Sequence, residues 1–133
     1  MRFDFTLPAD RGTLVTAYFP YGDFRADRNA EVRMLDSATG RVLAAHPVRR
    51  LREGGFFRFL ASGKVSLEVQ NFHRWEPGSG RLAGIFFDPA AEAASGNSAR
   101  FLGVDEERPG LWRGRYGSSG WILPGENRRQ LSD

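Results

Sequence analysis

Apolar and polar residues alternate along much of this chain with the period of two that is typical of a β-strand with one buried face. Val65, Leu67 and Val69 alternate with polar residues, and residues 2–7 follow the same pattern. Residues 82–87 are apolar on both faces, which predicts a central strand covered on both sides. A turn-forming run at 76–80 lies between these stretches, so we expect residues 64–70 and 82–87 to form a central hairpin.

Further short apolar runs, separated by turn residues, predict strands at 13–19, 31–35, 41–48, 56–60, 100–104, 112–116 and 121–123. Residues 36–40 predict a hairpin turn between the second and third of these strands. No segment shows a convincing helical period. We therefore expect an all-β fold, a two-sheet antiparallel β-sandwich of jelly-roll type.

Length and composition limit the remaining choices. At 133 residues the chain predicts one domain, with the sandwich at 1–123 and a polar C-terminal tail at 124–133. The absence of cysteine excludes disulfides and cysteine metal sites. No run has the length of a membrane span and none resembles a signal peptide, so we interpret the chain as an excised module that does not enter the membrane.

The charge balance is only mildly basic, with a net charge of +3. Four arginines are candidates for a basic patch that binds phosphate or an acidic polysaccharide; they are Arg49, Arg50, Arg52 and Arg58. The acidic residues interspersed with them favour an ordinary solvated surface. The modest net charge also argues against nucleic acid as a partner.

No catalytic constellation stands out, so we expect that the protein is not an enzyme. Nothing places a nucleophile beside either histidine, and the carboxylates lie on predicted strand surfaces or in turns. His46 alternates with apolar residues, which favours a half-buried structural histidine. His73 follows a strand and is a candidate to hydrogen-bond a ligand hydroxyl, although a surface histidine without a role is the favoured alternative.

One loop contains a candidate set of oxygen ligands for a structural Ca²⁺, namely Asp23, Asp27 and Asn29. Their spacing lacks the glycine and the terminal glutamate of an EF-hand loop. The favoured alternative is a solvated acidic loop, with no cofactor bound.

Aromatic residues in predicted loops carry most of the functional argument. Trp75 and Tyr21 lie in turn-rich loops, while Trp112, Tyr116 and Trp121 cluster near the C-terminus. Aromatic rings stack on the apolar faces of sugars while neighbouring polar groups bond the hydroxyls. The C-terminal three alternate with small or charged residues, so positions in the core are the alternative for them.

Several stretches occur in the order and spacing of a recurring bacterial module: RFDFTLPAD at 2–10, AYF at 17–19, EVRMLDSATGRVL at 31–43, GKVSLEV at 63–69 and LAGIFFDP at 82–89. Over residues 2–89 the chain resembles non-catalytic galactose-binding-like β-sandwich modules of planctomycetes and actinobacteria. This resemblance implies a carbohydrate-binding accessory module of a secreted glycoside hydrolase, hence an extracellular location and a neighbouring catalytic domain.

The segment LWRGRYGSSGWILPG at 111–125 also resembles these modules, in which it usually opens the unit. Two explanations stay open. The chain is a permuted variant whose last hairpin completes its own sandwich, which we favour, or the tail begins a following unit. The loops around Tyr21 and before Leu82 depart from the family pattern, so the resemblance does not imply a particular glycan.

Together these observations predict a module that binds a polysaccharide or oligosaccharide by aromatic stacking and polar contacts. The stacking residues are Trp75, Tyr21, Trp112, Tyr116 and Trp121, and the polar ones are Asp23 and His73. The alternative is a structural β-sandwich that packs against a neighbouring domain and binds no sugar.

Overall fold

The computed structural model describes residues 2–20, 30–48, 54–71, 82–105, 117–118, 120–123 and 128–131. Within them the chain forms ten strands and no helix. The strands are β1 Arg2–Thr6, β2 Thr13–Pro20, β3 Ala30–Asp36, β4 Val42–Val48, β5 Gly54–Ser62, β6 Lys64–Asn71, β7 Gly84–Pro89, β8 Ser98–Asp105, β9 Gly120–Leu123 and β10 Arg128–Leu131.

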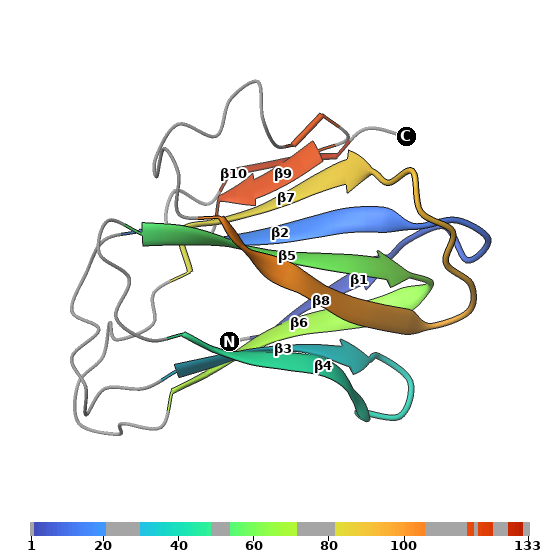
Figure 1. The fold of residues 1–133 in the computed structure, drawn as a ribbon, viewed down its shortest axis with the longest axis horizontal. Helices are drawn as coiled ribbons and strands as arrows, with labels where there is room; N and C mark the ends of the chain where they lie inside the picture. The colour runs from blue at the N-terminus through green and yellow to red at the C-terminus, as the bar shows by residue number, and fades with distance from the viewer. Residues whose placement is uncertain are drawn as a thin grey trace.

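The strands form two sheets that lie one over the other (Figure 1). The smaller sheet has the order β1-β6-β3-β4, and the larger sheet has the order β10-β9-β7-β2-β5-β8. Every strand pair within these sheets is antiparallel. The predicted two-sheet antiparallel β-sandwich is therefore confirmed.

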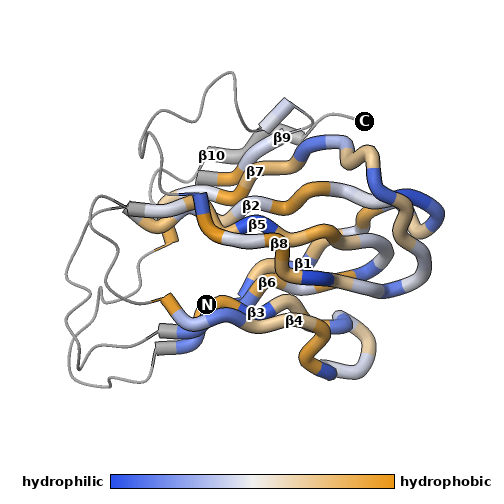
Figure 2. Tube along the Cα trace, in the orientation of Figure 1, coloured by the Kyte–Doolittle hydropathy of each residue, from blue (hydrophilic) through white to orange (hydrophobic). Residues whose placement is uncertain are grey.

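Successive side chains of a strand point to opposite faces of its sheet, so every second residue of both sheets can enter one shared core. Val15, Ala17 and Phe19 of β2 and Val65, Leu67 and Val69 of β6 turn inward and are buried. Hydrophobic positions recur along β7, β2 and β5 in the middle of the larger sheet (Figure 2). Each fully buried large side chain stabilises the fold by about 1.5–3 kcal/mol.

Aromatic contacts join the two sheets. Phe5 of β1 meets Phe87 of β7 edge to face, with ring centroids 5.0 Å apart. His46 of β4 stacks on Phe101 of β8 at 4.1 Å and meets Phe57 of β5 edge to face. The predicted half-buried, structural position of His46 is confirmed.

The predicted central hairpin is wrong, because β6 and β7 belong to different sheets. β6 pairs with β1 and β3, whereas β7 pairs with β2 and β9. Only a strand inside a sheet, covered on both faces, can bury every residue from Gly84 to Asp88. The apolar patterns identified both strands correctly, but they carry no information about which strand each one pairs with.

The turn at 36–40 does join a hairpin, β3 and β4, as predicted. Asp36 shapes it by accepting hydrogen bonds from the backbone N–H groups of Ala38 and Thr39. Gly40 closes it in the left-handed region at φ +76°.

The C-terminal part adds to the same sandwich. β9 pairs with β7, and β10 pairs with β9 at the edge of the larger sheet. Four residues of the stretch predicted as a polar tail, Arg128–Leu131, therefore form a strand. The predicted strand at 112–116 lies outside the described residues.

Candidate functional site

Most of the sequence-predicted ligand residues lie outside the described part of the chain. These are Trp75, Tyr21, His73, Asp23, Trp112 and Tyr116, together with the calcium candidates Asp27 and Asn29. Their predicted roles stay predictions. Trp121 is the member of the predicted set that the structure places.

The strands that flank the predicted loop residues converge at one end of the sandwich. Pro20 of β2 lies opposite Gly54 of β5, and Ala30 of β3 lies opposite Asn71 of β6. In Figure 1 the C-terminal ends of β2 and β6 and the N-terminal ends of β3 and β7 lie on the same side. Tyr21 and Asp23 follow β2 directly, and His73 follows β6, so both segments are attached at this end.

The described residues form a separate aromatic cluster on the outer face of the larger sheet. Trp121 of β9 lies opposite Phe86 of β7, and Phe86 packs against Phe56 of β5 with ring centroids 6.3 Å apart. Tyr18 of β2 stacks on Phe56 at 4.6 Å. Phe56 and Phe86 are fully buried, and the half-buried Tyr18 and Trp121 pack against them. We call these four residues the aromatic strip.

Strand register explains why the strip faces away from the core. Ile122, Ile85 and Ala17 occupy one row across three strands, and all three are buried in the core. The preceding row contains Trp121, Phe86, Thr16 and Arg58 on successive strands, and its side chains leave the sheet on the opposite face. A second aromatic cluster thus lies on the outer side of a sheet whose inner side forms the core, and two of its rings, Phe56 and Phe86, are buried.

Arg58 and Thr16 are unusual members of that row. Thr16 is completely buried, and its hydroxyl has no hydrogen-bond partner among the described residues. Arg58 is half-buried, and its Nε is buried, also without a partner in that part of the chain. Ion pairs among the described residues engage Arg2, Arg33 and Arg100, but not Arg58.

Space is open on the other side of Arg58. Its partner on β8 is Gly103, and the register shifts by one residue directly after this pair. Gly103 has φ +144°, and a Cβ built on it would meet nothing within 4 Å. Arg58 is therefore flanked by the closed, polar position of Thr16 and by an open position at Gly103.

Tyr18 contributes a polar group, its phenol hydroxyl, to the aromatic strip. Burial raises the pKa of its phenol above the ordinary value of 10.0, because the anionic form loses hydration. Tyr18 therefore stays neutral through the physiological range and can donate a hydrogen bond beside its ring.

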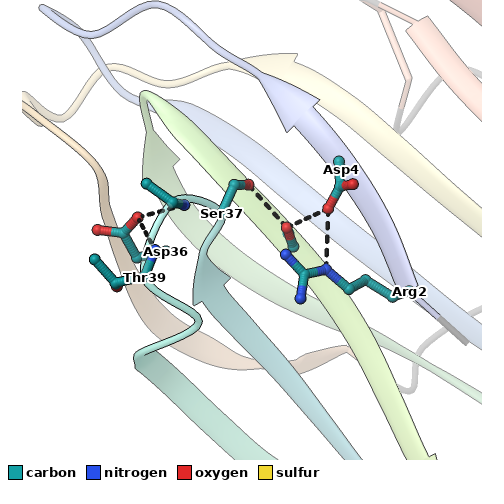
Figure 3. A network of polar contacts seen from close by, with 7 residues as sticks. Arg2, Asp4, Asp36, Ser37 and Thr39 are labelled. Carbon is teal, nitrogen blue, oxygen red and sulfur yellow. Dashed lines mark hydrogen bonds and ion pairs between the residues drawn. The ribbon is translucent and has the colours of Figure 1, made fainter.

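Polar networks elsewhere have evident structural roles. Ser66 donates to the Asp4 carboxylate, and because its single proton is used there, Ser37 must donate to Ser66 at 2.8 Å (Figure 3). Likewise Ser62 donates to the Gly96 carbonyl at 2.7 Å, so Ser98 donates to Ser62. These chains of hydrogen bonds connect β1, β5, β6 and β8 to the adjoining turns.

Within the described ranges, no group of three or more histidine, aspartate or glutamate residues is placed to hold a metal ion. In the same part of the chain, no helix is long and apolar enough to cross a membrane.

Sequence reasoning did not single out Phe56, Phe86, Thr16 or Gly103, and it considered Arg58 only as part of a basic patch. A signal for the strip was present, because residues 56–60 and 82–87 carry large apolar side chains on both faces. Comparison with known proteins adds no further assignment: no family model, no curated protein and no solved structure matches the chain. The resemblance to galactose-binding-like modules therefore rests on the quoted motifs.

Proposed function

We propose that this chain is a non-catalytic carbohydrate-binding module. The observation that carries the proposal is the aromatic strip, in which the half-buried Trp121 and Tyr18 pack against the buried pair Phe56 and Phe86 and keep part of their own surface exposed. Rings held on a rigid sheet lose little conformational freedom when a ligand stacks on them. Apolar sugar faces suit such rings, and a few polar groups beside them fix the orientation of the ligand.

The predicted loop residues extend the same proposal. Trp75, Tyr21, Trp112 and Tyr116 would supply further stacking, and Asp23 and His73 would bond hydroxyls. Support comes from the convergence of the flanking strands at one end of the sandwich (Figure 1). A calcium ion at Asp23, Asp27 and Asn29 would serve to order that loop.

The family resemblance supports a wider setting for the module. It would belong to a larger exported bacterial glycoside hydrolase, act outside the cell and hold a neighbouring catalytic domain near its polymer substrate. Affinity of one such site should be modest, because a shallow surface buries little of the ligand.

Trp121→Ala tests the proposal, with retention of the protein on insoluble polysaccharides and calorimetric titration with soluble glycans as readouts. We expect a loss of retention of ten-fold or more. Trp121→Phe keeps a ring against Phe86 and should retain most of the binding. Val42→Ala is the matched control, because Val42 is a 47% exposed hydrophobic residue in the other sheet. Binding by wild type that is indifferent to Trp121→Ala and to Trp75→Ala would contradict the proposal.

The alternative is a structural β-sandwich that packs against a neighbouring domain. The observation that favours it is the partly exposed aromatic pair Tyr18 and Trp121 on the outer face, because aromatic residues are enriched at protein interfaces. Under this alternative, wild type binds no glycan, and Trp75→Ala changes neither retention nor the stability of the isolated chain. A direct titration of wild type with a broad glycan panel separates the two functions.

A further inference from the structure

We propose that the free edge of β1 binds one extended strand of a partner protein, which joins the smaller sheet and lies beneath β9. The inference goes beyond carbohydrate binding, because β1 belongs to the smaller sheet and the aromatic strip belongs to the larger one. The two proposals can therefore be tested separately.

The first observation is that the two sheets differ in width on one side only. On one side β4 lies against β8, as the stacking of His46 on Phe101 shows. On the other side Phe5 of β1 meets Phe87 of β7. There β9 and β10 continue the larger sheet past β7 (Figure 1), whereas no described strand continues the smaller sheet past β1. The larger sheet thus extends over the position next to β1 that an added strand would take.

The second observation is that backbone groups of β1 face this position. The N–H of Leu7 donates to the carbonyl of Gly63 at 2.9 Å, and this pair continues the register of β1 with β6. Residues of an antiparallel pair alternate between hydrogen-bonded and non-hydrogen-bonded positions. Counting back from Leu7, every second residue bonds β6, and the residues between them direct their N–H and C=O groups to the free edge. These are Arg2, Asp4 and Thr6.

The edge of β1 also lacks features that hinder pairing with a further strand. Edge strands are commonly protected by a proline or a bulge. β4 contains Pro47, and the pairing of β8 with β5 shifts register next to Gly103. β1 keeps one register over all five residues and contains no proline. A strand added to β10, the other edge of the larger sheet, would have no described strand of the smaller sheet beneath it.

The inward side chains of β1 indicate one face of the partner strand. Phe3 and Leu7 pack against the core but remain partly exposed. On the neighbouring β6, Val65 and Leu67 are completely buried. An added strand with apolar residues on its inner face would cover the exposed parts of Phe3 and Leu7, and burial of apolar surface favours association.

The outward side chains indicate the other face. Arg2 and Asp4 form an ion pair, yet their side chains remain 41% and 69% exposed. Opposite charges directly across two strands stabilise their pairing. The partner should therefore place an acid opposite Arg2 and a base opposite Asp4. With a polar residue opposite Thr6, an antiparallel partner strand reads polar, apolar, basic, apolar, acidic.

The geometry favours a single strand over a second copy of this chain. If two copies paired through β1, the β1 of the second copy would lie beneath β9 of the first. The β7 of that copy covers its own β1, so it would have to occupy the space that β9 already fills. An isolated extended segment has no second layer and avoids this collision. Addition of such a segment to a sheet edge gains main-chain hydrogen bonds, and the alternating side chains give specificity.

The test titrates the full chain with labelled peptides, read by fluorescence anisotropy. The probe carries the sequence TVKVE between flexible flanks, and the control peptide TKVVE has the same composition without the alternation. We expect TVKVE to bind at least ten-fold more tightly than TKVVE. TVEVK, which exchanges the two charges, should also bind more weakly than TVKVE. Equal binding of all three peptides, or no binding of TVKVE at millimolar concentration, would overturn the inference.

A pair of variants at Thr6 tests the contribution of the backbone. Thr6→Pro removes one N–H from the free edge, and proline is tolerated at a sheet edge where that group faces outward. It should weaken the binding of TVKVE at least ten-fold. Thr6→Val keeps the N–H and should bind as wild type does. Unchanged binding by a folded Thr6→Pro variant would contradict pairing through this edge.

Amide hydrogen exchange, followed by NMR, tests the edge without any substitution. In the free chain the amides of Arg2, Asp4 and Thr6 should exchange faster than those of Phe3 and Phe5, which bond β6. Saturating TVKVE should slow exchange at the first three by ten-fold or more. Slow exchange at these three in the free chain would mean that residues of the chain itself already occupy the edge, and would overturn the inference.

Sedimentation of the chain without peptide distinguishes the remaining occupant. A concentration-dependent dimer that is lost in Thr6→Pro would assign the edge to a second copy and overturn the single-strand partner. Retention on glycans should be the same with and without TVKVE. Failure of peptide binding leaves the carbohydrate-binding function standing, and failure of glycan binding leaves the edge of β1 as proposed.

Discussion

Asp88 accepts two hydrogen bonds from Ser118, one from its backbone N–H and one from its hydroxyl, both at 2.8 Å. The second oxygen of the carboxylate accepts the N–H of Gly117 at the same distance. Asp88 lies near the end of β7, and Ser118 precedes β9, which pairs with β7. One carboxylate thus fixes the start of the strand that carries Trp121.

We predict that Asp88→Ala lowers the free energy of unfolding by about 2–3 kcal/mol, since hydrogen bonds to a charged group are worth about 1.5–3 kcal/mol. Ser118→Ala removes only the hydroxyl bond and should cost about 1 kcal/mol. Urea unfolding of both variants measures the difference. Equal losses for the two variants would mean that the backbone N–H groups do not depend on Asp88.

Gly63 and Gly40 provide a matched pair for separating backbone strain from crowding. Both have left-handed φ values, +74° and +76°. A Cβ on Gly40 meets nothing within 4 Å, whereas one on Gly63 would lie 2.5 Å from the Gly96 carbonyl oxygen and would collide with Asn97. Gly40→Ala should cost about 1 kcal/mol, from the left-handed backbone alone.

For Gly63→Ala, crowding adds about 1–3 kcal/mol to the backbone term, because the clashing atom belongs to the main chain. The Lys64 N–H bond to Asn97 should be lost with it. Thermal unfolding of the two alanine variants under identical conditions gives the comparison. Similar losses would show that the turn at 96–97 moves aside at little cost.

Acid should weaken the hydrogen-bond network that joins Arg2 and Asp4 of β1 to Ser66 of β6. The hydrogen bond from Ser66, followed by the one from Arg2, lowers the pKa of Asp4 below its ordinary value of 3.8. A carboxyl group with a lowered pKa in the folded state contributes stability above pH 3.8 that is lost as the pH falls further. Ser66→Ala should flatten this acid limb of the stability curve, as should Asp4→Asn. The free energy of unfolding, measured from neutral pH to pH 2, checks this prediction. If its slope against pH is the same in the variants as in wild type, the Asp4 network does not cause the loss of stability in acid.

Tyr18 should make the protein less stable as the pH rises, whereas Asp4 makes it less stable as the pH falls. Its pKa is raised by burial, so the stability it contributes is complete below the ordinary value of 10.0 and is lost as the pH rises through the folded-state pKa. Ultraviolet titration of the phenolate should show one late-ionising tyrosine, absent from Tyr18→Phe. If the missing transition in that variant is the earliest one, Tyr18 is more hydrated than its contacts imply.

A bound glycan should delay that same ionisation further if it stacks on Tyr18. The ligand displaces water from the phenol and so raises its pKa again. Repeating the titration with a saturating glycan tests the position of the ligand without any substitution. An unchanged Tyr18 transition would place the ligand elsewhere on the module.

Most strands of this fold, β10 excepted, were predictable from the sequence, but apart from the β3–β4 hairpin their partners were not. Alternation at Val65, Leu67 and Val69 identifies a strand and its buried face, since both depend on local period alone. Placing β7 between β2 and β9 depends on contacts with residues far away in sequence, about which a local pattern is silent. The error over the central hairpin came from assuming that neighbouring strands in sequence are neighbours in a sheet.

The aromatic strip was missed for a related reason. Phe56 and Phe57 look alike in the sequence, yet one leaves the sheet outward and the other enters the core. Only the register with β2 and β8 assigns each its face. Trp121 was singled out from its residue type and its place near other aromatics, whereas its contact with Phe86 became visible only once β9 was placed beside β7.

The docking of β9 onto β7 has a consequence for biosynthesis. While residues 117–123 are still inside the ribosome, the edge of β7 next to Phe86 exposes unpaired backbone N–H and C=O groups. Such an edge can pair with a strand of another chain. This edge is covered only when residues 120–123 have been translated and β9 pairs with β7. A prematurely released nascent chain should therefore need chaperone protection more than its nearly complete core suggests.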